Sequence, residues 1–404
     1  MNFKISNDLS DTGWRSPVIL LMAMAATLQI SFASWTILTN NFAVEILSFT
    51  GKEIGIQQSI REIPGFFAFA AIFLLFFIRE QVLAFVSLAV LGGAAALTGL
   101  FPSISGFLII TFISSMGYHY FETMNQSLSL QWLPKKTAPA TMGKIMAFGS
   151  FAQLVTFAFV FVMWKLFEFG YTTIFIITGG TTLIGVVIMV FSFPMFRQGT
   201  AQRKNLVLRK RYWLYYALTF MGGARRQIFL VFAAFMMVER FGFKVHEIAV
   251  LFFINGALNM YFAPKIGGWI VRFGERRTLT VEYIGLILIF TAYAFVPNVW
   301  IAIGLYIIDH AFFAMAIAMK TYFQKIADPA DISPTAGVAF TINHIAAVFI
   351  PVWFGLLWLW SPAAVFLAGA AMAAISLALA QLIPYSPEEG IEFRWLETAR
   401  NREG

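Results

Sequence analysis

The sequence predicts an all-α membrane protein with twelve transmembrane helices in two pseudo-symmetric six-helix bundles. Three observations lead to this fold class. Hydrophobic residues make up 59% of the 404 residues and charged residues only 12%, about half the share that is typical of soluble domains. Apolar runs long enough to cross a bilayer, which takes about 20 helical residues, recur twelve times along the chain. A basic polar stretch at 197–211 separates the first six runs from the last six.

Each apolar run is expected to form one membrane-spanning helix. The first run begins at Pro17 and is too long for a cleavable signal peptide, so we count it as a span. In chain order the expected spans are 17–44, 54–78, 82–101, 104–133, 144–167, 171–195, 212–238, 246–270, 279–297, 299–324, 336–360 and 362–384.

Lysine and arginine are distributed unevenly between the two sides of the membrane that these spans define. With the N-terminus in the cytoplasm, 19 of the 28 basic residues fall in cytoplasmic segments and four in outer loops. The positive-inside rule then predicts that both termini are cytoplasmic in a multi-pass protein of the inner or plasma membrane. The net charge of +8 is therefore a signal of orientation in the bilayer, and no nucleic-acid partner is expected.

Several classes of function lack their sequence signatures. The chain contains no cysteine, which excludes a disulfide framework, a thiolate metal site and a cysteine nucleophile. It has neither a P-loop for ATP nor the HExxH or paired Cys/His spacing of a metal enzyme. We therefore expect a non-enzymatic protein with no catalytic residues, no cofactor and no resident metal, acting as a monomer.

The two halves of the chain share a weak internal repeat. Val44 and Glu45 recur as Val238 and Glu239, and the dipeptide at 53–54 recurs at 247–248, with a constant offset of 194. Such a repeat is typical of a duplicated transporter unit. The expected domains are a first bundle at 1–196, a cytoplasmic linker at 197–211, a second bundle at 212–384 and a cytoplasmic tail at 385–404.

Twelve spans, a basic central linker and related halves resemble the major facilitator superfamily. The loop after the eighth span resembles the family's conformational-switch loop at Gly268, Arg272, Gly274, Arg276 and Arg277. Val271 stands where the family usually has an acid, which makes the charge relay attributed to that acid doubtful here. The resemblance implies secondary transport by alternating access, with the first, fourth, seventh and tenth helices around a central cavity.

The seventh expected span carries Arg225, Arg226 and Gln227 near its middle. A guanidinium at bilayer depth costs at least a few kcal/mol, so such residues are kept where water or a partner reaches them. Arginine suits carboxylate and phosphate groups, which predicts binding of an anionic substrate. Adjacent helical residues point about 100° apart, so one arginine is expected to bind substrate while the other pairs with Glu122, Asp309 or Glu62. The alternative is that both arginines only hold helices together.

Three further spans carry polar groups. In the fourth, Glu122 is a proton-coupling candidate, and so are Asp309 and His310 in the tenth. Burial raises the pKa of a carboxyl group and a nearby arginine lowers it, so a change of surroundings can bind or release a proton. A fixed salt bridge is the alternative for either acid. The remaining candidates for substrate contact are Tyr118, His119 and Asn125 of the fourth span and Gln29 of the first.

Arg61 and Glu62, just before Pro64 in the second span, are a candidate outer gate or simply a local pair beside a proline kink.

We therefore predict a secondary active transporter of a small or medium organic anion, coupled to protons. Symport is favoured over export because the fifth span lacks the glycine–proline signature of drug-exporting antiporters. Two alternatives remain open. One is an exporter of amphipathic or cationic compounds, and the other is a non-transporting lipid-binding, pigment-binding or sensor protein with a transporter fold.

Overall fold

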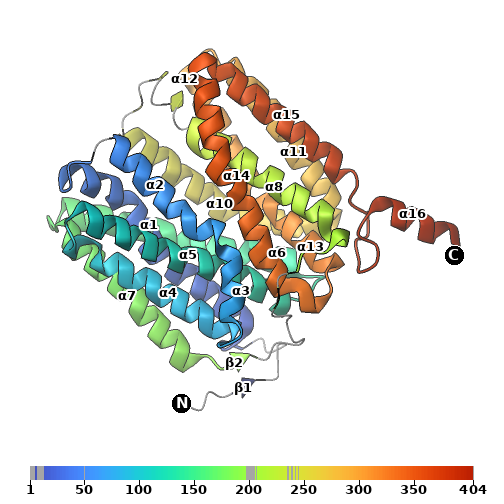
Figure 1. Ribbon diagram of the computed structural model, residues 1–404, viewed down its shortest axis with the longest axis horizontal. Helices are drawn as coiled ribbons and strands as arrows, with labels where there is room; N and C mark the ends of the chain where they lie inside the picture. Colours follow the sequence, from blue (N-terminus) through green and yellow to red (C-terminus); the bar gives the residue numbers. More distant parts are fainter. Residues whose placement is uncertain are drawn as a thin grey trace. The chain divides into compact units, whose positions relative to one another are not determined.

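The computed structural model is almost entirely α-helical (Figure 1). It describes residues 5–6, 13–49, 51–196, 205, 207–233, 236–237, 240–241, 243 and 245–403. Within these residues, nine helical segments are long and apolar enough to cross a membrane: Pro17–Thr39, Glu80–Leu100, Ile104–Trp132, Ala138–Lys165, Tyr171–Ser192, Glu275–Ala294, Val299–Ile326, Pro329–Ile350 and Pro362–Ala380. The predicted all-α membrane fold is confirmed.

The other three expected spans coincide with interrupted or partly described helices. The second corresponds to α2 (Gly51–Phe66), which contains Pro64 and is followed by the short turns η1 (Ala68–Ala70) and α3 (Ala71–Leu74). The seventh corresponds to α8 (Trp213–Gln227), which runs into the π-helical η4 (Ile228–Ala233). The eighth corresponds to α10 (Val245–Phe273). The twelve-helix arrangement is consistent with these positions.

The described residues form two compact units. The first comprises 1–133, 145–206 and 333–340. Its helices are α1 (Pro17–Glu45), α2, α3, α4 (Glu80–Leu97) with η2 (Thr98–Leu100), α5 (Ile104–Trp132), most of α6 (Ala138–Lys165) and α7 (Tyr171–Ser192), with a two-stranded parallel pairing of β1 (Ile5–Ser6) and β2 (Met195–Phe196). Within this unit α4 packs on both α5 and α7, and α1 packs on α7.

Small residues let these helices approach at backbone distance. A Cβ added to Gly117 of α5 would lie 2.7 Å from the Leu91 nitrogen of α4. A Cβ added to Gly179 of α7 would lie 2.4 Å from the Gly92 oxygen, which also belongs to α4. Helices in a bilayer gain little from hydrophobic burial against each other, so such close contact supplies much of their attraction. The glycines thereby fix α4 between α5 and α7.

Buried hydroxyls join α1 to α7. Ser31 donates a 2.7 Å hydrogen bond to Thr182, and Ser34 donates a 3.0 Å bond to Thr178. All four side chains are buried. Hydroxyl pairs of this kind link membrane helices without placing charge in the apolar interior.

The second unit comprises 134–144, 207–332 and 341–404. Its elements are the start of α6, η3 (Lys210–Tyr212), α8, η4, α10, α11 (Glu275–Ala294), α12 (Val299–Phe312), η5 (Phe313–Ala316), α13 (Ile317–Ile326), η6 (Pro329–Asp331), most of α14 (Ile332–Trp360), α15 (Pro362–Ala380) and α16 (Arg394–Glu403). Within it α11 packs along α15, and α15 packs on α8. The division into bundles at 1–196 and 212–384 stays a prediction.

One end of the second unit is held by a buried acid. Asp331 accepts hydrogen bonds from the Tyr212 hydroxyl at 2.9 Å and from Nη2 of Arg209 at 3.2 Å. The same tyrosine oxygen accepts the Asp328 N–H at 3.0 Å. These bonds attach the segment that enters α8 to the loop between α13 and α14.

Two neighbouring glycines of α7 provide a direct test of the close helix packing. We expect Gly179→Ala to lower the free energy of unfolding by about 1–3 kcal/mol, because the new methyl group would overlap the α4 backbone. Gly180→Ala is the matched control. Apart from its chain neighbours and the backbone of its own helix, no atom lies within 4 Å of the added carbon, and alanine favours the helix. Thermal unfolding of the purified variants measures both effects. Equal melting of Gly179→Ala and wild type would show that α7 does not pack this closely on α4.

Candidate functional site

The residues of α8 bring two adjacent arginines to different surroundings. The helix packs closely on α14, where a Cβ added to Gly223 would lie 2.5 Å from the Asn343 oxygen. Immediately after Gln227 the helix widens into the π-helical η4, a feature that occurs often at functional sites. Arg225 and Arg226 are therefore placed in the last turn of a closely packed helix, and their side chains diverge around its axis.

Arg225 is buried and is held by contacts with two other helices. Its Nη2 lies 3.8 Å from Oε1 of Glu282 in α11, and its Nη1 donates a hydrogen bond to Ser376 of α15. Its Cζ lies 4.4 Å from the centre of the Tyr283 ring, a cation–π distance. Glu282 was not among the partners that the sequence indicated, although it is an acid within an expected span. Attention to every acid in the apolar runs would have found it.

A second buried carboxylate belongs to the same neighbourhood. Asp309 of α12 interacts electrostatically with both Glu282 and Arg225. Within the described residues, Oδ2 of Asp309 and Oε2 of Glu282 are buried without a hydrogen-bond partner. We call Arg225, Glu282 and Asp309 the acid–arginine cluster. It holds two carboxyl groups and one guanidinium, so it can accept a proton without leaving an unpaired positive charge.

Tyrosines and one histidine surround this cluster. Tyr306 and Tyr293 both interact electrostatically with Asp309. His310 contacts the Tyr306 carbonyl oxygen through Nδ1 at 3.0 Å, within the same helix. The predicted proton-coupling residues Asp309 and His310 are thus consecutive residues of α12, with Asp309 buried and His310 half-buried.

Arg226 is in a different situation. Its side chain is half-buried, and its Nε is buried without a hydrogen-bond partner. Among the residues that the structure describes, no carboxylate forms an ion pair with it. The backbone of Gln227 ends α8, and its side chain lies outside what the structure describes. Among the described residues, Arg226 is therefore the less neutralised of the two arginines.

The first unit carries the remaining substrate candidates on α1 and α5. Tyr118 stacks on Phe32, with ring centres 4.5 Å apart and planes at 15°. Its ring also meets His119 edge-on at 5.0 Å. The side-chain oxygens of Gln29 and Asn125 are buried and lack a hydrogen-bond partner within the described part of the chain. Glu122 is half-buried on the same helix.

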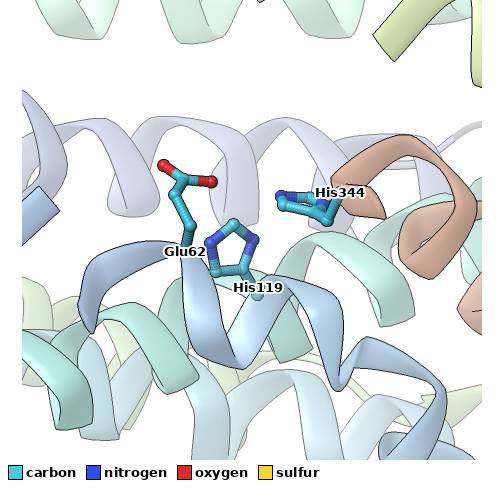
Figure 2. Close-up of side chains that lie close together, drawn as sticks. All are labelled: Glu62, His119 and His344. Atoms are coloured by element: carbon cyan, nitrogen blue, oxygen red, sulfur yellow. The ribbon is translucent and has the colours of Figure 1, made fainter. Parts of the chain in front are cut away.

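The candidate gate residues lie at a junction between α2 and α5. Arg61 and Glu62 form a 3.4 Å ion pair, and Ser115 donates a hydrogen bond to the Arg61 carbonyl oxygen. Figure 2 shows the Glu62 carboxylate and the His119 imidazole rising toward each other from their helices, and their ligand atoms lie within 4.8 Å. Glu62 therefore lies near the substrate candidate His119, a proximity that the sequence did not indicate.

The residues of the predicted switch loop lie where α10 meets α11. Gly268 and Arg272 are in the last turns of α10, Arg276 and Arg277 are in the first turn of α11, and only Gly274 lies between the helices. Gly274 adopts a φ of +83°, a conformation that suits glycine, and α11 begins at the next residue. Arg276 donates a 3.1 Å hydrogen bond to Gln381 and lies 4.3 Å from the Tyr385 ring centre. Gly268, Arg272 and Arg277 are exposed.

An acid is present in this loop, four residues after the position where the family pattern has one. Glu275 is buried and forms a 2.7 Å ion pair with Lys325 of α13, whereas Val271 is exposed. An acid in the first turn of a helix is also favoured by the helix dipole. The loop therefore retains an ion pair, from a residue outside the positions of the predicted motif.

Comparison with known proteins identifies the chain's relatives. A sequence model described as Major Facilitator Superfamily matches residues 15–351. The human organic anion transporter MFSD10 (TETRAN) has a similar structure, with a TM-score of 0.70 and 12% identity over 90% of this chain and 98% of that chain. A mutant of the E. coli fucose:proton symporter FucP has a TM-score of 0.70 and 14% identity over 90% and 97%.

A third similar structure is a mutant of the nucleoside transporter NupG, with a TM-score of 0.59 and 15% identity over 90% of this chain and 98% of that chain. At such identities these similarities show the fold. No curated protein sequence matches the chain.

The acid–arginine cluster leads to a stability prediction. We expect Arg225→Met to lower the free energy of unfolding by about 3–5 kcal/mol, because Glu282 would be left as an uncompensated buried charge. The double variant Arg225→Met/Glu282→Leu should recover most of that loss, since apolar replacement of a whole buried pair is often neutral. Arg226→Met is the matched control and should cost less than about 1 kcal/mol. Thermal unfolding in detergent measures all three, and a double variant no more stable than Arg225→Met would contradict the pairing.

Proposed function

Because the chain belongs to the Major Facilitator Superfamily, we propose that it is a secondary active transporter for a small or medium organic anion. It moves this anion across the inner or plasma membrane by alternating access. Transport is coupled to protons, and import by symport is favoured over export. Both termini are cytoplasmic in this proposal, and the protein acts as a monomer.

The proposal of an anionic substrate rests on one observation: the two adjacent arginines differ in their ion pairing with carboxylates. Arg225 is buried against Glu282, Ser376 and Tyr283. Arg226 is half-buried and has no ion pair with a carboxylate among the described residues. Retaining an unpaired guanidinium at this depth is costly unless an anionic ligand or water reaches it. Arg226 is therefore the proposed anion-binding residue, with Gln227 beside it.

The remaining substrate contacts come from α1 and α5. The stacked rings of Tyr118 and Phe32 offer a flat apolar surface for the body of an organic solute. Gln29 and Asn125 supply amide groups whose oxygens lack partners within the described residues, and His119 adds an imidazole beside Tyr118. These groups are the proposed substrate contacts of the first unit.

Proton coupling rests on the surplus of carboxyl groups in the acid–arginine cluster. When both Glu282 and Asp309 are ionised, one guanidinium balances only one of them, and the second is an unpaired buried charge. Protonation of one carboxyl removes this excess. Asp309 is the proposed proton carrier, with His310 next to it, and Glu122 is a second proposed carrier on α5.

Conformational control is proposed for the two remaining groups of residues. The loop at Gly268, Arg272, Gly274, Arg276 and Arg277 acts as the switch, supported by the Glu275–Lys325 ion pair. Arg61 and Glu62 act as a gate, supported by their ion pair and by the nearness of Glu62 to His119.

The structurally similar proteins include an organic anion transporter and a fucose:proton symporter. At 12% and 14% identity these similarities support the fold alone. The proposal of an anionic substrate therefore rests on Arg226, and the proposal of proton coupling rests on the acid–arginine cluster.

Binding of organic anions to the purified protein is the first test. A thermal-shift screen of small carboxylates, sulfonates and phosphate esters should yield a stabilising ligand, because a ligand that binds only the folded state raises its stability. Arg226→Gln should weaken that ligand's apparent affinity by about tenfold or more, as expected when a charge-assisted hydrogen bond is lost. Lys265→Gln, which removes an exposed cation of α10, is the matched control and should bind like wild type.

Proteoliposomes then test transport and coupling with the same ligand. An imposed proton gradient should drive its accumulation in wild type. Asp309→Asn should abolish accumulation while exchange of labelled for unlabelled ligand continues, because binding is retained and only the proton carrier is lost. Accumulation of cations in place of anions would favour the exporter of cationic compounds. Saturable binding without accumulation or exchange would favour the sensor or binding protein.

A further inference from the structure

A cavity of about 350 Å³ lies in the second unit, where α11 and α14 end and α15 begins. Among the residues that the structure describes, none of the predicted substrate, proton-coupling, switch or gate residues lines it. Its walls include Arg240, Tyr293, Trp358, Ser361 and Phe366. Small-molecule sites in proteins begin at about this volume and combine apolar walls with a few convergent polar groups.

The apolar wall is built from packed aromatic rings. Tyr293 stacks on Phe366 with ring centres 5.0 Å apart and planes at 18°. Trp358 meets Phe366 edge-on at 5.9 Å and stacks on Phe232 at 5.6 Å. Because these rings support one another from η4, α11, α14 and α15, the wall is preformed and suits a flat apolar group.

The polar side of the cavity is positive. Ser361 caps α15 by accepting the Ala364 N–H at 3.3 Å, and Ser361, Pro362 and Ala363 all line the cavity. The N-terminus of this 19-residue helix, which carries the positive end of the helix dipole, is therefore part of the wall. The exposed guanidinium of Arg240 adds a full positive charge.

Tyr293 belongs to the apolar wall of this cavity. The residue is only 1% exposed and its hydroxyl oxygen has almost no accessible surface, so its ring is the part that lines the cavity. The hydroxyl interacts electrostatically with Asp309 of α12 instead.

We infer that this cavity binds an amphipathic organic anion. Arg240 and the N-terminus of α15 hold its negatively charged head, and the rings of Tyr293, Trp358 and Phe366 pack against its apolar body. Two sources share this chemistry: a free aromatic carboxylate, and an anionic lipid with its phosphate at Arg240 and part of an acyl chain on the rings. This site is separate from Arg226, so its occupancy does not depend on the proposed transport function.

Quenching of tryptophan fluorescence tests the inference on the full-length protein in neutral detergent. The probe is bromonaphthoate, whose bromine quenches a tryptophan that it contacts. We expect saturable quenching of wild type and a smaller quenched fraction in Trp358→Phe. Arg240→Ala should weaken the apparent Kd by about tenfold or more, Arg240→Lys should restore most of it, and Lys165→Ala, which removes an exposed lysine elsewhere, should leave it unchanged.

A second arm distinguishes the sources. Nanodiscs containing phosphatidylglycerol with brominated acyl chains are compared with nanodiscs of brominated phosphatidylcholine. Extra quenching by the anionic lipid that unlabelled naphthoate reverses assigns the site to lipid, whereas quenching by bromonaphthoate alone assigns it to a free solute. Either result supports an anion site. Absence of saturable quenching by both probes, equal binding to wild type and Arg240→Ala, or equally tight binding of the uncharged methyl ester of the probe would overturn it.

Discussion

Burial of the Arg225 guanidinium is the constraint on which the second unit depends. A charge removed from water costs several kcal/mol unless partners compensate it. Here the compensation comes from the Glu282 carboxylate at 3.8 Å, the Ser376 hydroxyl and the face of the Tyr283 ring. These groups belong to α11 and α15, so one side chain of α8 couples three helices.

This coupling also determines the surroundings of Arg226. Consecutive residues of an α-helix point about 100° apart, so directing Arg225 toward α11 and α15 turns Arg226 away from those partners. Arg226 stays half-buried without a carboxylate among the described residues. Arginine therefore serves as an internal counter-charge at Arg225, whereas Arg226 has no carboxylate partner among the described residues.

Charge balance within the acid–arginine cluster gives the proposal of proton coupling its physical basis. Two buried carboxyl groups interact with one guanidinium, so when both are ionised one of them has no cation to balance it. Any movement of α8 relative to α11 or α12 changes how strongly Arg225 stabilises each carboxylate. A conformational cycle of these helices would then bind and release a proton through the acid–arginine cluster alone.

The sequence by itself determined the membrane fold, the positions of most spans and the polar residues available within them. Hydrophobic run length and the distribution of lysine and arginine depend on transfer between water and lipid, which is a local property of the chain. Arg225, Arg226 and Asp309 were recognisable for the same reason, since charge in an apolar run is costly wherever it lies.

Only the tertiary structure decided which of these charges meet. The pairing of Arg225 with Glu282, and of Glu275 with Lys325, depends on helix rotation and packing between segments about 50 residues apart along the chain. Sequence periodicity indicates the face of a helix but not its neighbour. The aromatic cavity at the start of α15 could not be predicted from the sequence either. Its walls come from several helices, and which helices meet is decided only by the packing of the unit.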